Sequence, residues 1–176
     1  DLKHTDAGRL SQAVYGLPEL YRADIKKAKL VANPGCYPTA AILALAPLCA
    51  TYTNAIQSII IDAKSGVSGA GRKLAQQFCE VHENFKAYKV LNHQHTPEIN
   101  LYLSRLAGKD VRVNFVPHLI PVNRGILETI YVQFKSPVQE DKIFALYRNF
   151  YKTEKFIRIL SPGAQPELKD VVGSNY

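Results

Sequence analysis

The spacing of hydrophobic positions along the chain predicts both strands and helices. Short apolar runs that are rich in β-branched and aromatic residues predict strands, whereas apolar positions that recur every three or four residues predict amphipathic helices. By this criterion the strands are 29–32, 57–63, 86–91, 112–117, 125–134, 156–160 and 170–176. The helices are 6–15, 18–27, 37–50, 73–81, 93–108 and 139–152.

These strands and helices mix without a strict alternation. This order favours an α+β fold, a mixed β-sheet with helices packed on it, over a doubly wound sheet. The run 57–63 is rich in β-branched residues and predicts a strand buried on both faces. We expect strands 112–117 and 125–134 to be neighbours, with antiparallel pairing as one arrangement. The length of 176 residues suits one sizeable core, so we expect one domain over residues 1–176.

Composition and charge narrow the functional class. Hydrophobic residues make up 47% of the chain and charged residues 21%, as in ordinary soluble domains. No apolar run reaches the ~20 residues of a membrane span. The net charge of +7 is spread evenly, without a basic stripe interleaved with aromatic residues, so we expect no nucleic-acid partner. A positive cleft would instead favour a small anionic substrate.

The cysteine count and the first residue carry further expectations. Three widely spaced cysteines predict neither a disulfide framework nor a zinc site, and they favour a reducing compartment. No grouping of Cys, His and carboxylate residues has metal-ligand spacing, so we expect no metal. The chain begins at Asp1 and contains no methionine, so we expect a piece of a longer polypeptide.

The strongest chemical signal is Cys36, which follows the turn Asn33-Pro-Gly35 and precedes Tyr37-Pro38. A cysteine between a strand and a helix start lies at the positive end of the helix dipole, where the thiolate is favoured. Gly35 would let a substrate or a second backbone come close. The alternative is a buried structural cysteine. Cys49, in an apolar run, is predicted to be such a core residue, and Cys79 to pack within a helix.

His95 is the candidate partner of this cysteine. It precedes Thr96-Pro97-Glu98, in which Thr96 suits an N-cap and Pro97 the first helical position. The helix dipole would disfavour imidazolium there and keep His95 neutral as a general base. Glu98 on the first turn would orient the ring. The alternative is a surface histidine beside an acidic residue that stabilises the helix.

Two further groups of residues are candidates for binding an anion. The segment Ser65-Gly66-Val-Ser68-Gly-Ala-Gly-Arg72 follows a predicted strand, and its backbone N–H groups could converge on a phosphate or carboxylate. The alternative is a flexible turn, and the glycine spacing does not fit a dinucleotide fingerprint. His118 and Arg124 lie near predicted strand ends, where sites are commonly built. Their alternative is a capped turn with an exposed arginine.

The segment Val31–Pro47 resembles, at each defined position, the active-site signature of the N-acetyl-γ-glutamyl-phosphate reductases of arginine biosynthesis. Other motifs are similar in order and spacing across almost the whole chain. They are Ser65–Arg72, His93–Ile99, Phe115–Pro121 followed by Arg124-Gly125, and Gly173–Tyr176.

This resemblance implies an NADPH-dependent, cytoplasmic enzyme (organellar in a eukaryote) that reduces an acyl phosphate to a semialdehyde and releases phosphate. It implies that Cys36 forms a thioester and that His95 assists as acid and base; Glu98 as the orienting residue is our own assignment. The implied substrate-binding residues are Ser65, Gly66, Ser68, Arg72, His118 and Arg124, and the implied positions near the NADP nicotinamide are Gly35 and Asn175.

The resemblance also implies a fold like the C-terminal catalytic domain of glyceraldehyde-3-phosphate dehydrogenase-like reductases. It implies a homo-oligomer, either a dimer or a tetramer. The family's N-terminal NADP-binding Rossmann domain and the C-terminal return to it are absent from residues 1–176. We therefore expect a catalytic, substrate-binding and oligomerisation domain that does not turn over alone.

Three alternative functions remain at this stage. The first is reduction of a carrier-linked aminoadipyl phosphate in lysine biosynthesis. The second is a cofactor-free Cys–His hydrolase, and the third is a non-catalytic interaction module. Alkylation of Cys36 at neutral pH, faster than that of Cys49, would argue against the third.

Overall fold

The computed structural model of the chain describes residues 6–70 and 81–176. In chain order the strands are β1 (Ala13–Tyr15), β2 (Leu30–Ala32), β3 (Ile56–Ser65), β4 (Lys86–Ala87), β5 (Asn114–Leu119) and β6 (Ile126–Phe134). The α-helices are α1 (Pro18–Ile25), α2 (Cys36–Tyr52), α4 (Thr96–Ala107) and α5 (Glu140–Phe150). Short 3₁₀ turns are η1 (Ala7–Gln12), η2 (Val67–Ala70) and η4 (Leu168–Asp170).

The main sheet is mixed and has the strand order β4-β5-β3-β6. β3 pairs in parallel with β5, with Ile61 opposite Phe115, and antiparallel with β6. The parallel pair is joined through α4, because parallel neighbours need a long crossover connection. β3 is therefore the central strand, and the residues that follow its last position, Ser65, lie beside the loop that leads into β6.

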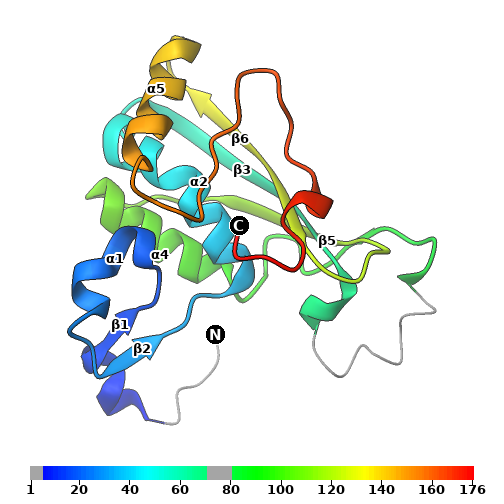
Figure 1. Cartoon of the computed structure of the whole chain (residues 1–176), viewed down its shortest axis with the longest axis horizontal. Helices are drawn as coiled ribbons and strands as arrows, with labels where there is room; N and C mark the ends of the chain where they lie inside the picture. The colour runs from blue at the N-terminus through cyan, green and yellow to red at the C-terminus, as the bar shows by residue number, and fades with distance from the viewer. Residues whose placement is uncertain (1–5, 71–80) are drawn as a thin grey trace.

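Helices cover one face of this sheet, and the other face stays open (Figure 1). Ile59 and Ile61 of β3 are buried against α2 and α4, where Ile42 and Leu103 complete the core. The intervening Ile60 is 41% exposed, and Tyr131, its partner on β6, is 58% exposed. Because successive strand residues point to opposite faces, only one face of β3 is buried, and the prediction of burial on both faces was wrong.

The helix α2 is packed deep in the domain, and its interior proline is accommodated by a tyrosine. Pro47 has no N–H, so it cannot bond to the carbonyl of Leu43 four residues earlier. The Tyr151 hydroxyl donates to that carbonyl at 2.5 Å, and the Tyr147 hydroxyl donates to the neighbouring carbonyl of Ala44. The carbonyl left free by the proline therefore fixes the end of α5 against α2.

A small second sheet leads the chain into α2. β1 and β2 pair in parallel around α1. A Cβ at Gly16, directly after β1, would lie 2.8 Å from the Val31 side chain and 3.2 Å from the carbonyl of Ala32. Only glycine permits this approach. The two strands thus place Tyr15 beside the turn at Asn33–Gly35, at the start of α2.

Most predicted elements are confirmed, and the exceptions have physical reasons. The helices at 18–27, 37–50, 93–108 and 139–152 and the strands at 29–32, 57–63, 112–117 and 125–134 are present within a few residues. Strands 112–117 and 125–134 are not neighbours, because β3 lies between them. The helix over 6–15 was wrong in its last three residues, which pair as β1.

Near the C-terminus the predicted strands were wrong. Residues 156–160 form no strand, and in 170–176 Asp170 ends η4 and a turn follows it at 171–174. Apolar side chains there pack without a strand partner: Leu168 and Val172 lie over Gly125, and Phe156 packs edge-on against Tyr176. The predicted strand 86–91 is reduced to two residues, Lys86–Ala87. Cys79 and nearly all of the predicted helix 73–81 lie outside the described residues.

The fold class is nevertheless the predicted one, a mixed sheet with helices packed on it. Cys49 is fully buried and is a core residue as predicted. In the described ranges, 6–70 and 81–176, none of the helices is both long enough and apolar enough to cross a bilayer.

Candidate active site

Cys36 is the first residue of α2 and is exposed to solvent. Gly35 is the N-cap residue, with extended backbone angles, so the first backbone N–H groups of the helix point towards the sulfur. A hydrogen bond with His95 lowers the pKa of Cys36, and backbone hydrogen bonds from Tyr37 and Cys36 lower it further against the opposing effect of burial. In contrast, burial raises the pKa of Cys49 to about 11. Cys36 is therefore the activated thiol of the two.

His95 is the N-cap residue of α4, and its ring lies between Cys36 and Glu98. Nδ1 lies 3.0 Å from Oε2 of Glu98, which leaves Nε2 for the thiol. The hydrogen bonds with Cys36 and Glu98 raise the pKa of His95 to about 9. The prediction of a neutral ring was wrong, because two anionic partners outweigh the helix dipole. At neutral pH the His95 ring is therefore an imidazolium, and its hydrogen bond favours the thiolate form of Cys36.

Glu98 accepts three hydrogen bonds from three separate elements. Its Oε2 accepts from His95, and its Oε1 accepts from the Tyr15 hydroxyl at 2.8 Å and from the Gly35 backbone N–H at 2.9 Å. Burial alone would raise the pKa of Glu98, but these donors lower it, so the carboxylate stays ionised. Glu98 therefore connects the end of β1, the start of α2 and the start of α4.

Gly35 is required for space rather than for backbone freedom. Its φ of −65° is open to any residue, but a Cβ there would lie 2.3 Å from Cε1 and 2.5 Å from Nδ1 of His95. Such distances do not occur between non-bonded atoms. The neighbour that Gly35 admits is the His95 ring, whereas the sequence suggested a substrate or a second backbone.

Cavities open on two sides of Cys36. The larger has a volume of about 670 Å³ and is bordered by the α2 start, the loop at Arg124 and the C-terminal segment that includes Asn175. We call it the Arg124 cavity. That segment, red in Figure 1, ends beside α2. A second cavity of about 360 Å³ also includes Cys36, with His95 and the segment that precedes it. The sulfur thus faces both spaces.

Comparison with known proteins identifies the family. The family model described as "Semialdehyde dehydrogenase, dimerisation domain" matches residues 36–176. The chain belongs to the semialdehyde dehydrogenase dimerisation-domain family. Curated relatives of this chain are named N-acetyl-gamma-glutamyl-phosphate reductase. Their name agrees with the resemblance that the sequence motifs carry.

The N-acetyl-gamma-glutamyl-phosphate reductase of Pelotomaculum thermopropionicum is 55% identical over 177 residues, which is 99% of this chain and 51% of the relative. The enzyme of the same name from Acetivibrio thermocellus is 53% identical over 169 residues, 95% of this chain and 49% of the relative. The chain therefore spans about half the length of these curated relatives.

Solved structures of semialdehyde dehydrogenases share the fold. Aspartate semialdehyde dehydrogenase II from Vibrio cholerae has a TM-score of 0.66 at 16% identity, over 93% of this chain and 56% of that chain. A probable aspartate-semialdehyde dehydrogenase from Pseudomonas aeruginosa has a TM-score of 0.66 at 21% identity, over 97% and 58%. At these identities the likeness shows the fold alone.

In this member of the semialdehyde dehydrogenase family, the loop after β3 does not form the expected anion-binding backbone. The N–H groups of Gly66, Val67 and Ser68 donate to the carbonyls of Gly125, Val122 and Asn123. A Cβ at Gly66 would lie 2.8 Å from backbone atoms of Val122 and Arg124, in the loop before β6. These N–H groups are therefore taken.

Only some of the predicted substrate-binding residues line the cavities at Cys36. Ser65, Ser68 and Arg124 line the Arg124 cavity together with Cys36 and Asn175. His118 lies within β5, with Nδ1 3.2 Å from a carboxylate oxygen of Asp62, and it lines neither cavity at Cys36. Arg72 lies outside the described residues. No cluster of three potential metal ligands occurs between residues 6 and 70 or 81 and 176.

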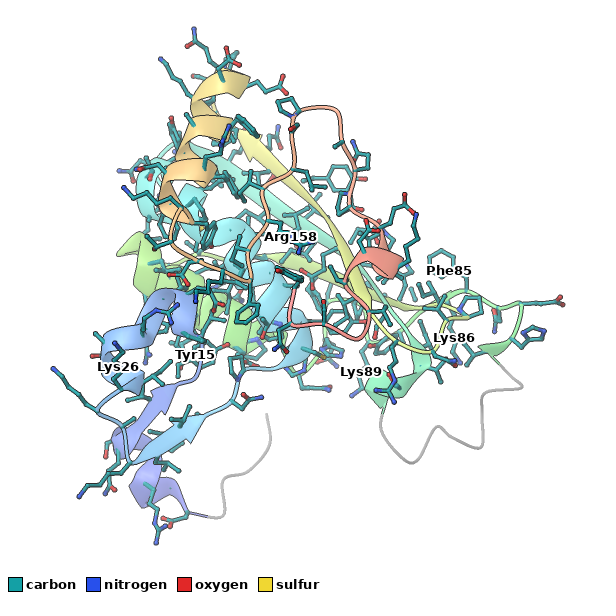
Figure 2. The ribbon with its side chains drawn as sticks, in the orientation of Figure 1. Tyr15, Lys26, Phe85, Lys86, Lys89 and Arg158 are labelled. Atoms are coloured by element: carbon teal, nitrogen blue, oxygen red, sulfur yellow. The ribbon has the colours of Figure 1, made fainter. Side chains whose placement is uncertain are left out.

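Tyr15 was missed by sequence reasoning, because residues 6–15 were expected to be helical. Tyr15, labelled in Figure 2, stacks on Tyr102 with ring centroids 3.5 Å apart. Only the pairing of β1 with β2 brings its hydroxyl to Glu98. No local pattern marks it.

We predict that Tyr15→Phe weakens the site without unfolding it. Loss of one hydrogen bond to the partly buried Glu98 carboxylate should lower the rate of Cys36 acylation by about 10-fold and move the midpoint of Cys36 alkylation to higher pH. Tyr21→Phe is the matched control, since Tyr21 packs edge-on against the same rings. Equal behaviour of the two variants would show that Tyr15 does not act through Glu98.

Proposed function

We propose that this chain is the catalytic half of an NADPH-dependent enzyme that reduces N-acetyl-γ-glutamyl phosphate to the semialdehyde and inorganic phosphate. The observation that carries the proposal is the continuous chain of contacts from Cys36 through His95 to Glu98, next to two open cavities. The curated relatives carry the name of this activity. We also propose a cytoplasmic location, or an organellar one in a eukaryote.

In the first half-reaction the Cys36 thiolate attacks the acyl carbon. The bond between that carbon and the bridging oxygen breaks, and its electron pair leaves with inorganic phosphate. A thioester of Cys36 remains. Thiolates suit this step because they are strong nucleophiles at neutral pH. Ser65, Ser68 and Arg124 line the cavity beside the sulfur. The Ser65 hydroxyl donates to the carbonyl of Gly66, so we propose that Ser68 and Arg124 bind the leaving phosphate.

The Arg124 cavity also fits a nicotinamide. Its volume of about 670 Å³ admits a ring beside the exposed sulfur, and Asn175 in its wall can hydrogen-bond a carboxamide. NADPH would supply there the hydride that a thioester, unlike a carboxylate, accepts. We propose that the missing half of the enzyme holds the rest of that cofactor, so this chain alone should not turn over.

His95 serves the second half-reaction through its proton. The hydrogen bond with Cys36 is the largest cause of its raised pKa. Acylation of the sulfur removes that cause, so the imidazolium becomes more acidic when a proton is needed at the substrate oxygen. Glu98 keeps Nδ1 bonded and the ring in place. The hydroxyl of the resulting thiohemiacetal then returns its proton to His95 as Cys36 departs as a thiolate, which releases the aldehyde and restores the pair.

A single-turnover experiment on the chain itself tests this proposal. Incubation with N-acetyl-γ-glutamyl phosphate should release about one phosphate per chain and add one acyl group to Cys36, as seen by intact-mass and peptide mass spectrometry. A cofactor-free hydrolase would instead release phosphate continuously. An aminoadipyl-phosphate reductase would acylate faster with the longer, carrier-linked substrate. Absence of an acyl group on Cys36 would refute the proposal.

We also propose a homo-oligomer in which a second copy covers the open face of the main sheet. The matched family is named for dimerisation. On the open face of the sheet, Ile60 and Tyr131 expose apolar surface. We predict that Ile60→Asp lowers the molar mass measured by light scattering to that of a single chain. Leu101→Asp, at a site 48% exposed on α4, is the control and should leave the mass unchanged. An unchanged mass for Ile60→Asp would place the interface elsewhere.

A further inference from the structure

The smaller cavity at Cys36 contains residues that the mechanism above does not use. It lies between the start of α2 and the segment that runs from β4 to His95, and it includes Lys86, Tyr88, Lys89, His93 and Gln94. We call it the lysine cavity. Figure 2 shows Lys86 and Lys89 on one side of the molecule, far from Lys26 on the other side.

The wall of the lysine cavity is positively charged. No Asp or Glu is among the described residues that line it. The Lys89 ammonium donates to Oε1 of Gln94 at 2.8 Å, so this side chain is held at the wall while its other N–H groups stay available. Lys86 has no ion pair among residues 6–70 and 81–176. The cavity therefore favours an anion.

His93 adds a neutral donor to the same wall. Its ring is 5% exposed, and Nδ1 accepts the backbone N–H of His95 at 3.2 Å. Burial lowers the pKa of His93 to about 4, so the ring is neutral at pH 7. Because Nδ1 is the acceptor, the single proton lies on Nε2. Because His93 is among the residues that line the cavity, this N–H is the group of the ring that we assign to an acceptor such as an amide oxygen.

We propose that the lysine cavity binds the carboxylate-bearing, N-acylated end of the substrate. Lys86 and Lys89 bind the carboxylate, and His93 donates to the oxygen of the acylamino group. This inference rests on the proposed function, since it assigns the tail of the same acyl phosphate. The reactive carbon then lies at Cys36, where both cavities meet, with the phosphate on the Arg124 side.

The charge of the lysine cavity also defines a selectivity. A free amino group on the substrate would be an ammonium, and it would face two lysines, with no Asp or Glu among the described residues of the lining. Acylation of that nitrogen removes the charge and supplies an oxygen acceptor. The cavity therefore selects N-acylated amino acids over free ones, by charge repulsion as much as by contact.

The test is protection of Cys36 from iodoacetamide by N-acetyl-L-glutamate, a stable compound that carries the proposed tail. We expect saturable protection of the chain, and protection by L-glutamate that is at least about 10-fold weaker. Lys86→Met/Lys89→Met should raise the half-protecting concentration of N-acetyl-L-glutamate by about 10-fold or more, since hydrogen bonds to charged groups are being removed. Lys26→Met, which removes one distant exposed lysine, should change nothing.

The outcomes separate this proposal from the proposed function. Unchanged protection in the double-lysine variant, or equal protection by L-glutamate, overturns the tail assignment even if the acyl phosphate still acylates Cys36. Lysine-dependent protection without any acylation supports the tail site and overturns the reductase chemistry. Acetyl phosphate, which lacks the tail, should acylate the wild type and the double-lysine variant at the same rate. A slower reaction in the variant would show general damage to Cys36 and overturn the assignment.

Discussion

Cys36→Ser is expected to abolish thioester formation from N-acetyl-γ-glutamyl phosphate, with a loss of roughly 10⁴-fold or more in the rate of phosphate release. The hydroxyl is of similar size, but its pKa lies far above that of the thiol. His95 can stabilise a thiolate at neutral pH and cannot ionise serine to a comparable extent. Phosphate release and intact mass, followed in a single turnover, measure the effect.

Cys49→Ala is the matched control for Cys36→Ser. Cys49 is fully buried, and its pKa is raised to about 11 by that burial. Its removal should therefore leave the acylation rate within about 2-fold, at a modest loss of packing. Loss of acylation in Cys49→Ala with retention in Cys36→Ser would reverse the assignment of the nucleophile.

The Cys36–His95 pair predicts a pH profile. The hydrogen bond from His95 lowers the pKa of Cys36, so alkylation should reach its plateau below the pH at which an ordinary thiol ionises. Activity of the complete enzyme should fall above about pH 9, where His95 loses its proton. In His95→Gln the alkylation midpoint should move up towards that of an ordinary cysteine. A midpoint that does not move would mean that His95 does not activate the thiol.

Gly35→Ala is expected to lower the acylation rate by roughly 100-fold, because catalytic groups displaced by about 1 Å lose about that much. The added Cβ would lie 2.3 Å from the His95 ring, so the ring must move away from Cys36 and Glu98. The backbone angles at position 35 are open to alanine, so the fold should persist. Circular dichroism and the melting temperature check that it does.

Gly8→Ala is the control for Gly35→Ala. A Cβ at Gly8 would make an ordinary contact, 3.7 Å from an oxygen of Asp6, so its rate should match the wild type. A crystal structure of Gly35→Ala should show the His95 ring displaced. Full activity in this variant would mean that the position of His95 is not critical.

Much of the site could be predicted from local sequence. Cys36 follows a Pro-Gly turn and starts a helix, and His95 and Glu98 begin another, so their secondary-structure positions follow from turn and cap residues. The i,i+3 spacing of His95 and Glu98 places them on one helix face. The burial of Cys49 in the core could likewise be predicted from its apolar neighbours in the sequence.

Other features depended on contacts between distant segments. The charge of His95 was predicted wrongly. The sequence shows the start of its helix, and so the helix dipole, but it does not show how close the ring lies to Cys36. The loop after β3 was expected to bind an anion, but its N–H groups bond to the loop before β6. Only the folded structure brings Lys86 and Lys89 around the same cavity as Cys36, and the role that we propose for them rests on that position.

The sequence by itself determined most of the local elements, the α+β character and the position of Cys36 at a helix start, because periodicity, turns and caps act over a few residues. Only the tertiary structure decided that β3 separates β5 from β6, that Gly35 makes room for a ring, and that Tyr15 supports Glu98. Those facts are distances between residues far apart in the chain. They follow from how the elements pack, and no short stretch of sequence contains them.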